Sequence, residues 1–338
     1  MTALTLATKQ NDAARPPRPL PWRRMVLVTW LQHRGVLSGV ATLFGALAIY
    51  LGIMGLIIHH AWTADMGCHP ASSLTCQDLA QSFQTRWHGG ATIAFPLQLL
   101  PALIGAFAGA PILAREMETG TFRYAWTQGF GRTRWVIAKL ALVGGPLVVI
   151  AGAFGILAYW YFGPLVAQGP LIPLDPRTFD LECLALPGWV LAAFAVGAFA
   201  GMLIRRVVPA MATTMAVVGG LGLAVGLYLR QHYLPPLIIP GANGPVPSAW
   251  TLGSWYTGRG GQVVSGYIVN AACPGPGPGN STPGAPPQCM PQHGYIQWWS
   301  YQPASRYWSF QGIEAGGLLL LAILLVVATI WLVHRRAA

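Results

Sequence analysis

Residues 37–58 read LSGVATLFGALAIYLGIMGLII, and this run decides the fold. It contains no charged residue, and a helix of this length covers a hydrocarbon core of about 30 Å. Because lipid offers no partner for backbone polar groups, such a run crosses a membrane as a helix or as part of a closed barrel. Barrel strands alternate between lipid-facing and lumen-facing residues, and this run does not alternate. We therefore expect a transmembrane helix.

Five further apolar runs complete a prediction of six transmembrane helices: residues 91–114, 135–162, 185–204, 207–229 and 313–333. The composition agrees, since 54% of the 338 residues are hydrophobic and only 9% are charged. Soluble domains carry roughly 25% charged residues, so a soluble fold is excluded. We predict an all-α integral membrane protein.

The placement of the basic residues predicts the orientation of the chain. With the N-terminus inside the cell, the inner segments hold fifteen Lys and Arg residues and three acidic residues. The outer segments hold five basic and six acidic residues. The positive charge that gives the net value of +11 thus lies on the inner side of the membrane, and it does not indicate a nucleic-acid partner. Eighteen of the twenty basic residues are Arg, and this ratio, with abundant Ala, Gly and Pro, indicates a GC-rich bacterial genome. We expect a multi-pass protein of the bacterial plasma membrane with both termini cytoplasmic.

All five cysteines fall in segments placed outside. Two close pairs, Cys68 with Cys76 and Cys273 with Cys289, are expected to form disulfides in an oxidising compartment. Cys183 is left over, and no metal site is predicted.

The chain divides into four regions on this topology. Residues 1–36 form a cytoplasmic N-terminus, 37–230 the first five helices, 231–311 an extracellular cap, and 312–338 the last helix with its tail. Within the cap, residues 274–291 are too rich in Pro and Gly for regular structure. Their flanks are rich in Trp and Tyr, which favours an ordered cap around a disulfide-closed tip.

The predicted spans are almost free of ionisable residues, which argues against a proton-driven transporter. Gln98 is the clearest polar residue inside a span, and we take it as a candidate for the substrate path. Pro96, Pro101 and Pro111 predict a bend in the second helix. Glycine pairs spaced by four residues predict close helix packing at 105/109, 197/201 and 222/226.

Residues 114–135, AREMETGTFRYAWTQGFGRTRW, join the second and third spans on the inner side. Gly120 is well placed to end the helix that leaves the bilayer. A short amphipathic helix is expected over residues 122–128. A helix in this position would transmit a push from a soluble partner to the transmembrane helices.

This stretch resembles the segment between helices two and three of ABC-2-type permeases, the membrane subunits of type-2 ABC exporters. The resemblance implies a cytoplasmic coupling helix that contacts the nucleotide-binding domain of a separate ATPase subunit. The implied ATPase-coupling residues are Arg115, Glu116, Glu118, Thr119, Gly120, Thr121, Phe122, Arg123 and Trp126.

Residues 21–31, PWRRMVLVTWL, look like the amphipathic elbow helix of the same family. Their basic and aromatic residues also suit an interfacial helix on physical grounds. The elbow residues implied are Trp22, Arg23, Arg24 and Trp30. The large extracellular region before the sixth helix is similar to the family pattern as well.

The chain lacks a Gly-x-x-x-x-Gly-Lys-Ser/Thr loop, so no cofactor is expected on it, and ATP and Mg are expected on the partner ATPase. The resemblance implies a non-enzymatic permease subunit that works with a second permease copy or paralogue and with membrane lipids. An uncharged interior favours export of an amphiphilic drug, lipid or hydrophobic peptide.

Two alternatives stay open. One is a membrane-embedded enzyme with a metal site in the first outer loop, which contains His59, His60, His69, His88, Asp65 and Asp78. The other is a ligand-sensing membrane protein that uses the extracellular region.

Overall fold

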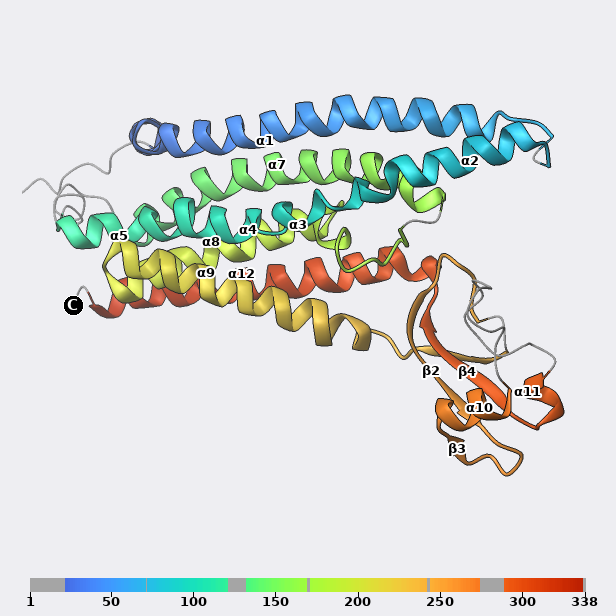
Figure 1. The fold of residues 1–338 in the computed structure, drawn as a ribbon. Coiled ribbons are helices and arrows are strands. Elements are labelled where there is room, and N and C mark those ends of the chain that lie inside the picture. Colours follow the sequence, from blue (N-terminus) through green and yellow to red (C-terminus); the bar gives the residue numbers. More distant parts are fainter. Residues whose placement is uncertain are drawn as a thin grey trace, which may run out of the picture.

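The computed structural model describes residues 22–70, 72–120, 132–168, 171–241, 244–273 and 289–336, which form a long helical bundle with a β-sheet at one end (Figure 1). All six apolar runs lie in segments long and apolar enough to cross a membrane. The prediction of six membrane-crossing helices is therefore confirmed on length and composition. The segments are Thr29–Met66, Leu74–Thr119, Thr133–Ala167, Ala185–Ile204, Val207–His232 and Ala304–Arg335.

The two ends of the bundle differ in what they carry. The start of α1 (Trp22–Met66), the end of α5 (Ala110–Thr119) and the end of α12 (Tyr307–Arg336) meet at one end (Figure 1). We call it the loop end, and it includes the connection from α8 (Ala185–Ile204) to α9 (Val207–Ala224). We call the opposite end, where the sheet lies, the sheet end.

The stretch expected to form a separate elbow helix is continuous with the first span, because α1 runs unbroken from Trp22 to Met66. Figure 1 shows its first turns nearly end-on, so the helix changes direction near its start. Trp30 is exposed, whereas the side chains of Trp22, Arg23 and Arg24 lie outside the described residues. The role of an elbow stays a prediction.

The second membrane-crossing segment is broken, as its prolines predict. Pro96, Pro101 and Pro111 each lie in a different helical piece, and a proline has no N–H to donate to the preceding turn. A π-helical turn at Gly105–Gly109 adds a further irregularity. The pieces are α2 (Leu74–Trp87), η1 (His88–Ala91), α3 (Ala94–Leu97), α4 (Leu100–Ile104), η2 (Gly105–Gly109) and α5.

Helix α8 is the centre of the bundle. It contacts α5, α9, α12 and α7 (Arg132–Ala167), and it is buried along most of its length. Glycine lets α8 approach the second segment closely, because a Cβ added at Gly197 would lie only 2.3 Å from the Gly105 carbonyl oxygen. The glycine pairs at 105/109 and 197/201 therefore form one close contact, as expected. A Cβ added to either glycine of the 222/226 pair would meet no described atom within 4 Å, so this pair makes no such contact.

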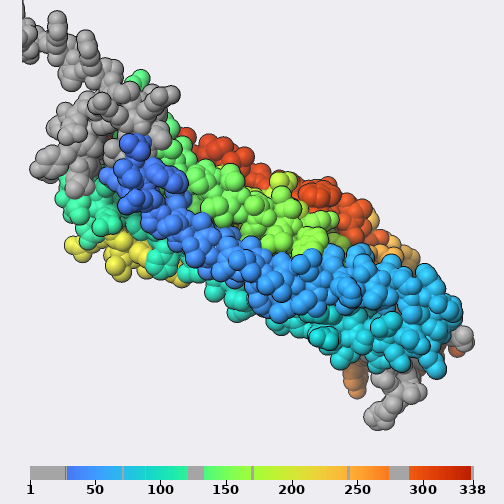
Figure 2. All heavy atoms as spheres, turned by 90° about the horizontal axis from the view of Figure 1, so that it is seen from above, coloured from blue at the N-terminus to red at the C-terminus, as the bar shows by residue number. Residues whose placement is uncertain are grey.

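Helix α1 packs on α7 at the edge of the bundle. Figure 2 shows it in blue along the outside, beside α7 in green. Its outward face is apolar, with Ile49, Ile53 and Leu56 exposed. In a membrane protein such faces contact lipid or another protein rather than water.

The prediction of an all-α protein is wrong for the region before α12. This region forms a four-stranded antiparallel sheet in the order β1-β4-β2-β3. The physical reason is composition, since aromatic and β-branched side chains favour strands, and Trp255 pairs directly with Trp298. The strands are β1 (Leu237–Pro240), β2 (Trp250–Thr257), β3 (Val263–Val264) and β4 (Ile296–Gln302).

Two short helices complete this sheet region, α10 (Gly266–Ala272) and α11 (Cys289–Gln292). The expected order of the cap is thus found in its flanks, whereas residues 274–288 of the predicted tip lie outside the described ranges. The remaining short helices lie at the sheet end of the membrane segments: η3 (Phe179–Leu181), η4 (Val225–Leu229), η5 (Arg230–His232) and η6 (Ala304–Arg306).

Candidate functional site

The predicted coupling segment begins where α5 leaves the bundle at the loop end. Gly120 ends the helix with φ +71°, a left-handed conformation that glycine adopts at little cost. Arg115, Glu118 and Thr119 are exposed there. The coupling residues Thr121, Phe122, Arg123 and Trp126 lie outside the described residues, so their expected helix stays a prediction.

Glu116 points into the bundle rather than away from it. Its Oε1 forms a salt bridge with Nζ of Lys139 on α7. The Lys139 side chain is 3% exposed, and its Nζ also lies 4.8 Å from the centre of the Trp135 ring. A buried ammonium needs such partners. The pair therefore ties the end of the second span to the start of the third.

Glu118 forms a second tie, to the fifth span. Its Oε2 accepts a hydrogen bond from the Val207 backbone N–H at 3.1 Å, at the first residue of α9. A carboxylate at this position satisfies an unpaired N–H and interacts favourably with the helix dipole. Sequence reasoning placed Glu116 and Glu118 in one segment, but their partners lie 23 and 89 residues away.

Gln98 lies in the second segment, near the sheet end. Its Nε2 donates hydrogen bonds to the backbone carbonyls of Pro176 at 3.0 Å and Arg177 at 2.9 Å. The residue lines a cavity of about 500 Å³ between this segment and α9. The wall from α9 includes Gly219 and Gly222, which leave room because they lack side chains. The structure thus puts the candidate substrate-path residue at a cavity.

A buried charged cluster lies beside this cavity at the sheet end. Arg230, fully buried, forms salt bridges with Asp180 and with Glu314 of α12. Glu314 also accepts hydrogen bonds from Trp189 Nε1 at 2.9 Å and Tyr233 Oη at 3.2 Å. Burial and the Glu314 carboxylate together raise the pKa of Asp180 well above its usual range, against the opposing effect of Arg230.

Comparison with known protein families shows to which family this chain belongs. A family model described as "ABC-2 membrane transporter related" matches residues 41–230, which is more than half of the chain. The chain belongs to this family. No curated protein and no solved structure matches it. The prediction of an ABC-2-type permease is confirmed, and with it a multi-pass membrane subunit of a class that lacks its own ATP-binding site.

Sequence reasoning missed the charged cluster of the permease. In the sequence, Arg230 and Glu314 lie at the ends of apolar runs and Asp180 lies between two of them, among the charges assigned to the outer side. Arg230 is separated from Asp180 by 50 residues and from Glu314 by 84. No local spacing reveals such a contact, although a charge at the end of an apolar run is a reason to look for a partner.

Both predicted disulfides of the permease are confirmed. Cys68 bonds to Cys76 beyond the end of α1, and Cys273 bonds to Cys289 between α10 and α11. Cys183 is free. The second bridge joins the two described residues that flank residues 274–288.

The metal-site alternative finds little support in the described part of the permease. His59 stacks on Trp160 at 4.3 Å and Asp65 accepts a hydrogen bond from Gln168, so both have structural partners. One group of three potential ligands was found there, Cys273, Cys289 and His293. Its two sulfurs form a disulfide and therefore offer no thiolate.

Proposed function

We propose that this permease is the membrane subunit of an ATP-driven exporter, powered by a separate ATPase that carries ATP and Mg. The main support for this proposal is a pair of side-chain contacts between helices at the loop end, one salt bridge and one hydrogen bond. Glu116 links α5 to α7 and Glu118 links α5 to α9. A force on the segment after Gly120 is then applied to three membrane-crossing helices at once. This is the mechanical property that a coupling element requires.

The transport unit is proposed to contain two permease copies or paralogues. The α9 face that lines the Gln98 cavity supports this, because Leu223 and Leu227 on it are largely exposed apolar residues. Facing copies would enclose the cavity between them. An apolar cavity with few polar groups suits an amphiphilic drug, lipid or hydrophobic peptide.

In this proposal the loop end faces the cytoplasm of a bacterial cell and the sheet end faces outward. Two disulfides at the sheet end support the orientation, because disulfides persist in oxidising compartments. The concentration of basic residues near the loop end supports it as well.

The first test is purification of the permease from its native membranes in mild detergent. We expect an ABC-type ATPase subunit to co-purify in fixed ratio, and the reconstituted complex to hydrolyse ATP and to move an amphiphilic dye out of the compartment that contains ATP. Recovery of the permease alone from every mild detergent, with no ATPase activity in any reconstituted mixture, contradicts the proposal.

The second test separates coupling from assembly. Glu118→Gln weakens the hydrogen bond to α9, whereas Arg34→Gln changes an exposed side chain of α1 at the same end that belongs to neither the coupling set nor the elbow set. Loss of a charge-assisted hydrogen bond is expected to lower transport per ATP hydrolysed by about tenfold in the Glu118 variant, with the ATPase still bound. The Arg34 variant serves as the control for a charge change at the loop end.

A further inference from the structure

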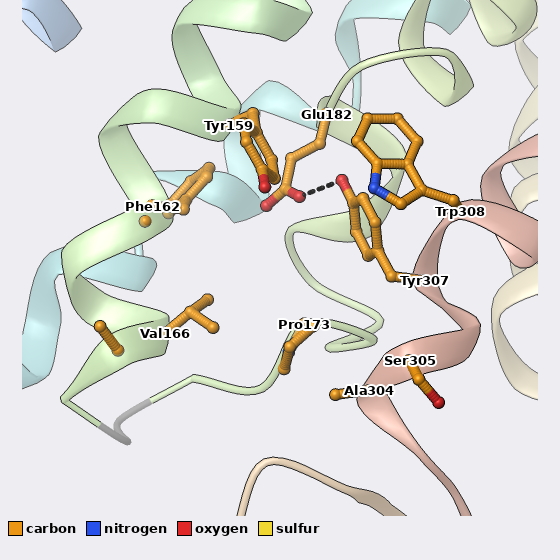
Figure 3. Close-up of a pocket in the computed structure, with 11 residues that line it drawn as sticks. Tyr159, Phe162, Val166, Pro173, Glu182, Ala304, Ser305, Tyr307 and Trp308 are labelled. Carbon is orange, nitrogen blue, oxygen red and sulfur yellow. Dashed lines mark hydrogen bonds between the residues drawn. The ribbon is translucent and has the colours of Figure 1, made fainter.

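A pocket of about 380 Å³ lies at the sheet end, between the end of α7, the loop before α8 and the start of α12 (Figure 3). It is separate from the Gln98 cavity and shares no lining residue with it. Its walls are mainly apolar and aromatic, with Phe162 and Val166 from α7 and Trp308 from α12. The space is large enough for a small organic molecule.

One carboxylate faces this apolar space. Glu182 is 4% exposed, and its Oε2 accepts a hydrogen bond from Tyr307 Oη at 2.6 Å. Tyr307 is held in turn by Gln311, whose Nε2 donates to Tyr307 Oη at 3.4 Å. Figure 3 shows the Glu182 carboxylate between Tyr159 and Tyr307. The acid is therefore positioned before any ligand arrives.

Glu182 has no cation as a partner within the described ranges, although every other buried acid there is paired with a base. Burial raises the pKa of its carboxyl to about 7, against the lowering effect of the Tyr307 hydrogen bond. Of its titratable neighbours, Asp175 is occupied by Arg177, and burial raises the pKa of the Cys183 thiol. A buried acid without a counterion is neutral when protonated, and when it ionises a bound cation offsets the cost of its buried charge.

Three aromatic rings that pack against one another line the pocket beside this carboxylate. The Tyr159 ring centre lies 5.9 Å from that of Tyr307 and 6.3 Å from that of Trp308, and the latter two are 5.3 Å apart. Aromatic rings grouped around one acid attract organic cations, whose charge is spread over alkyl groups and is weakly hydrated. A small metal cation is a poor fit, because it needs several oxygen ligands in place of water.

We propose that this pocket binds an organic ammonium group carried on an apolar body, with Glu182 as the counterion and Tyr159, Tyr307 and Trp308 as the ring wall. The site does not rest on the proposed transport cycle, since binding needs no ATPase. The ammonium group can belong to a soluble amphiphile or to a lipid headgroup such as phosphatidylethanolamine, and both carry the same chemistry.

The test uses the purified permease in nanodiscs of phosphatidylglycerol, a lipid without an ammonium group. The probe is benzyltrimethylammonium, followed by saturation-transfer NMR, and its neutral carbon isostere neopentylbenzene is the matched ligand. After subtraction of the signal from protein-free phosphatidylglycerol nanodiscs, whose anionic headgroups also attract the cation, we expect the cation to bind at least about tenfold more tightly than the isostere, because only the cation is attracted by the carboxylate. Equal affinities would overturn the proposal.

Variants locate the binding. Glu182→Gln is expected to weaken benzyltrimethylammonium binding by about tenfold or more, whereas Asp78→Asn, an exposed acid of α2, leaves it unchanged. If Glu182→Gln does not fold, the exposed Tyr159→Ala replaces it, with an expected loss of about threefold. Unchanged affinity in the folded variant overturns the site assignment.

The wild-type protein provides a test without any substitution. Because the Glu182 pKa is about 7, its ionised fraction, and with it the affinity, should fall by about tenfold from pH 8 to pH 6. A quaternary ammonium keeps its charge throughout, so the change reports the protein. If phosphatidylethanolamine in the nanodisc lowers benzyltrimethylammonium binding, the natural ligand is assigned to the lipid. If it does not, the natural ligand is assigned to a soluble amphiphile. A flat pH profile contradicts the proposal.

Discussion

Arg230 holds Glu314 by two parallel hydrogen bonds, from Nε to Oε2 and from Nη2 to Oε1, both at 3.0 Å. The contact joins the end of the fifth membrane-crossing segment to the start of α12. Asp180 contacts the same guanidinium from η3. One base thus forms salt bridges with two acids, so the loss of Arg230 removes both contacts whereas the loss of either acid removes one.

Loss of the base is expected to be the most damaging change. Arg230→Gln leaves two buried acids facing each other and should lower the free energy of unfolding by about 3–5 kcal/mol. Glu314→Gln should have a smaller effect of about 1–3 kcal/mol, because Asp180 remains as partner for Arg230. Unfolding by denaturant in detergent micelles measures both.

An exposed base provides the control. Arg86 is exposed on α2, and Arg86→Gln should change stability by no more than about 1 kcal/mol. If Glu314→Gln proves more harmful than Arg230→Gln, the arrangement of one base between two acids is not the source of stability.

A close backbone contact leads to the second prediction. A Cβ at Gly197 would meet the Gly105 carbonyl oxygen and the Ala110 nitrogen, whereas one at Gly222 would meet no described atom within 4 Å. Gly197→Ala should therefore destabilise by about 1–3 kcal/mol through forced separation of α8 from the second segment. Gly222→Ala should leave the stability of the isolated permease unchanged or raise it by up to about 1 kcal/mol, because alanine favours a helix more than glycine does. Thermal unfolding of the two variants in one detergent makes the comparison, and equal midpoints would refute it.

The sequence predicts the membrane segments well because each one depends on local composition. A run such as residues 37–58 contains no charged residue, and its length matches the thickness of the bilayer, so a membrane-crossing helix is predicted from this run alone. The bridge between Cys68 and Cys76 is also local, at a separation of 8 residues. These features need no knowledge of distant contacts.

Features that depend on distant partners could not be predicted in this way. The sheet pairs Leu237 with Tyr301, and the aromatic residues that indicated an ordered cap did not reveal its register. Likewise, Glu116 and Glu118 belong to a recognisable segment, but only the fold brings Lys139 and the Val207 N–H to them. The segment was predictable, and its mechanical ties were not.

A pH dependence of stability follows from Glu182. Its folded-state pKa of about 7 lies above the ordinary value of 4.5, so folding favours the protonated carboxyl. The stability that this provides is complete below pH 4.5 and is lost as the pH rises to 7. Glu182→Gln mimics the protonated acid and should therefore gain stability relative to the wild type between about pH 5 and pH 8.

The size of that gain is bounded by the shift, at about 1.4 kcal/mol for each pH unit between the two values. Apparent melting temperatures of the wild type and Glu182→Gln at pH 5, 6, 7 and 8 provide the measurement. A difference that is constant with pH would show that the carboxyl titrates at its ordinary value.

The cysteines allow a prediction about both oxidation state and orientation. Of the five cysteines, four form bridges and Cys183 is free. The denatured protein should therefore take up one maleimide without reductant and five after reduction, as measured by mass spectrometry.

On intact cells treated with reductant, an impermeant maleimide should label Cys273 and Cys289, because the proposed topology exposes the sheet end to the outside. The exposed position Arg335, changed to cysteine at the loop end, should react only after the cells are opened. Labelling of that position in sealed cells, with protection of Cys273 and Cys289, would invert the orientation and place the coupling segment on the side without ATP.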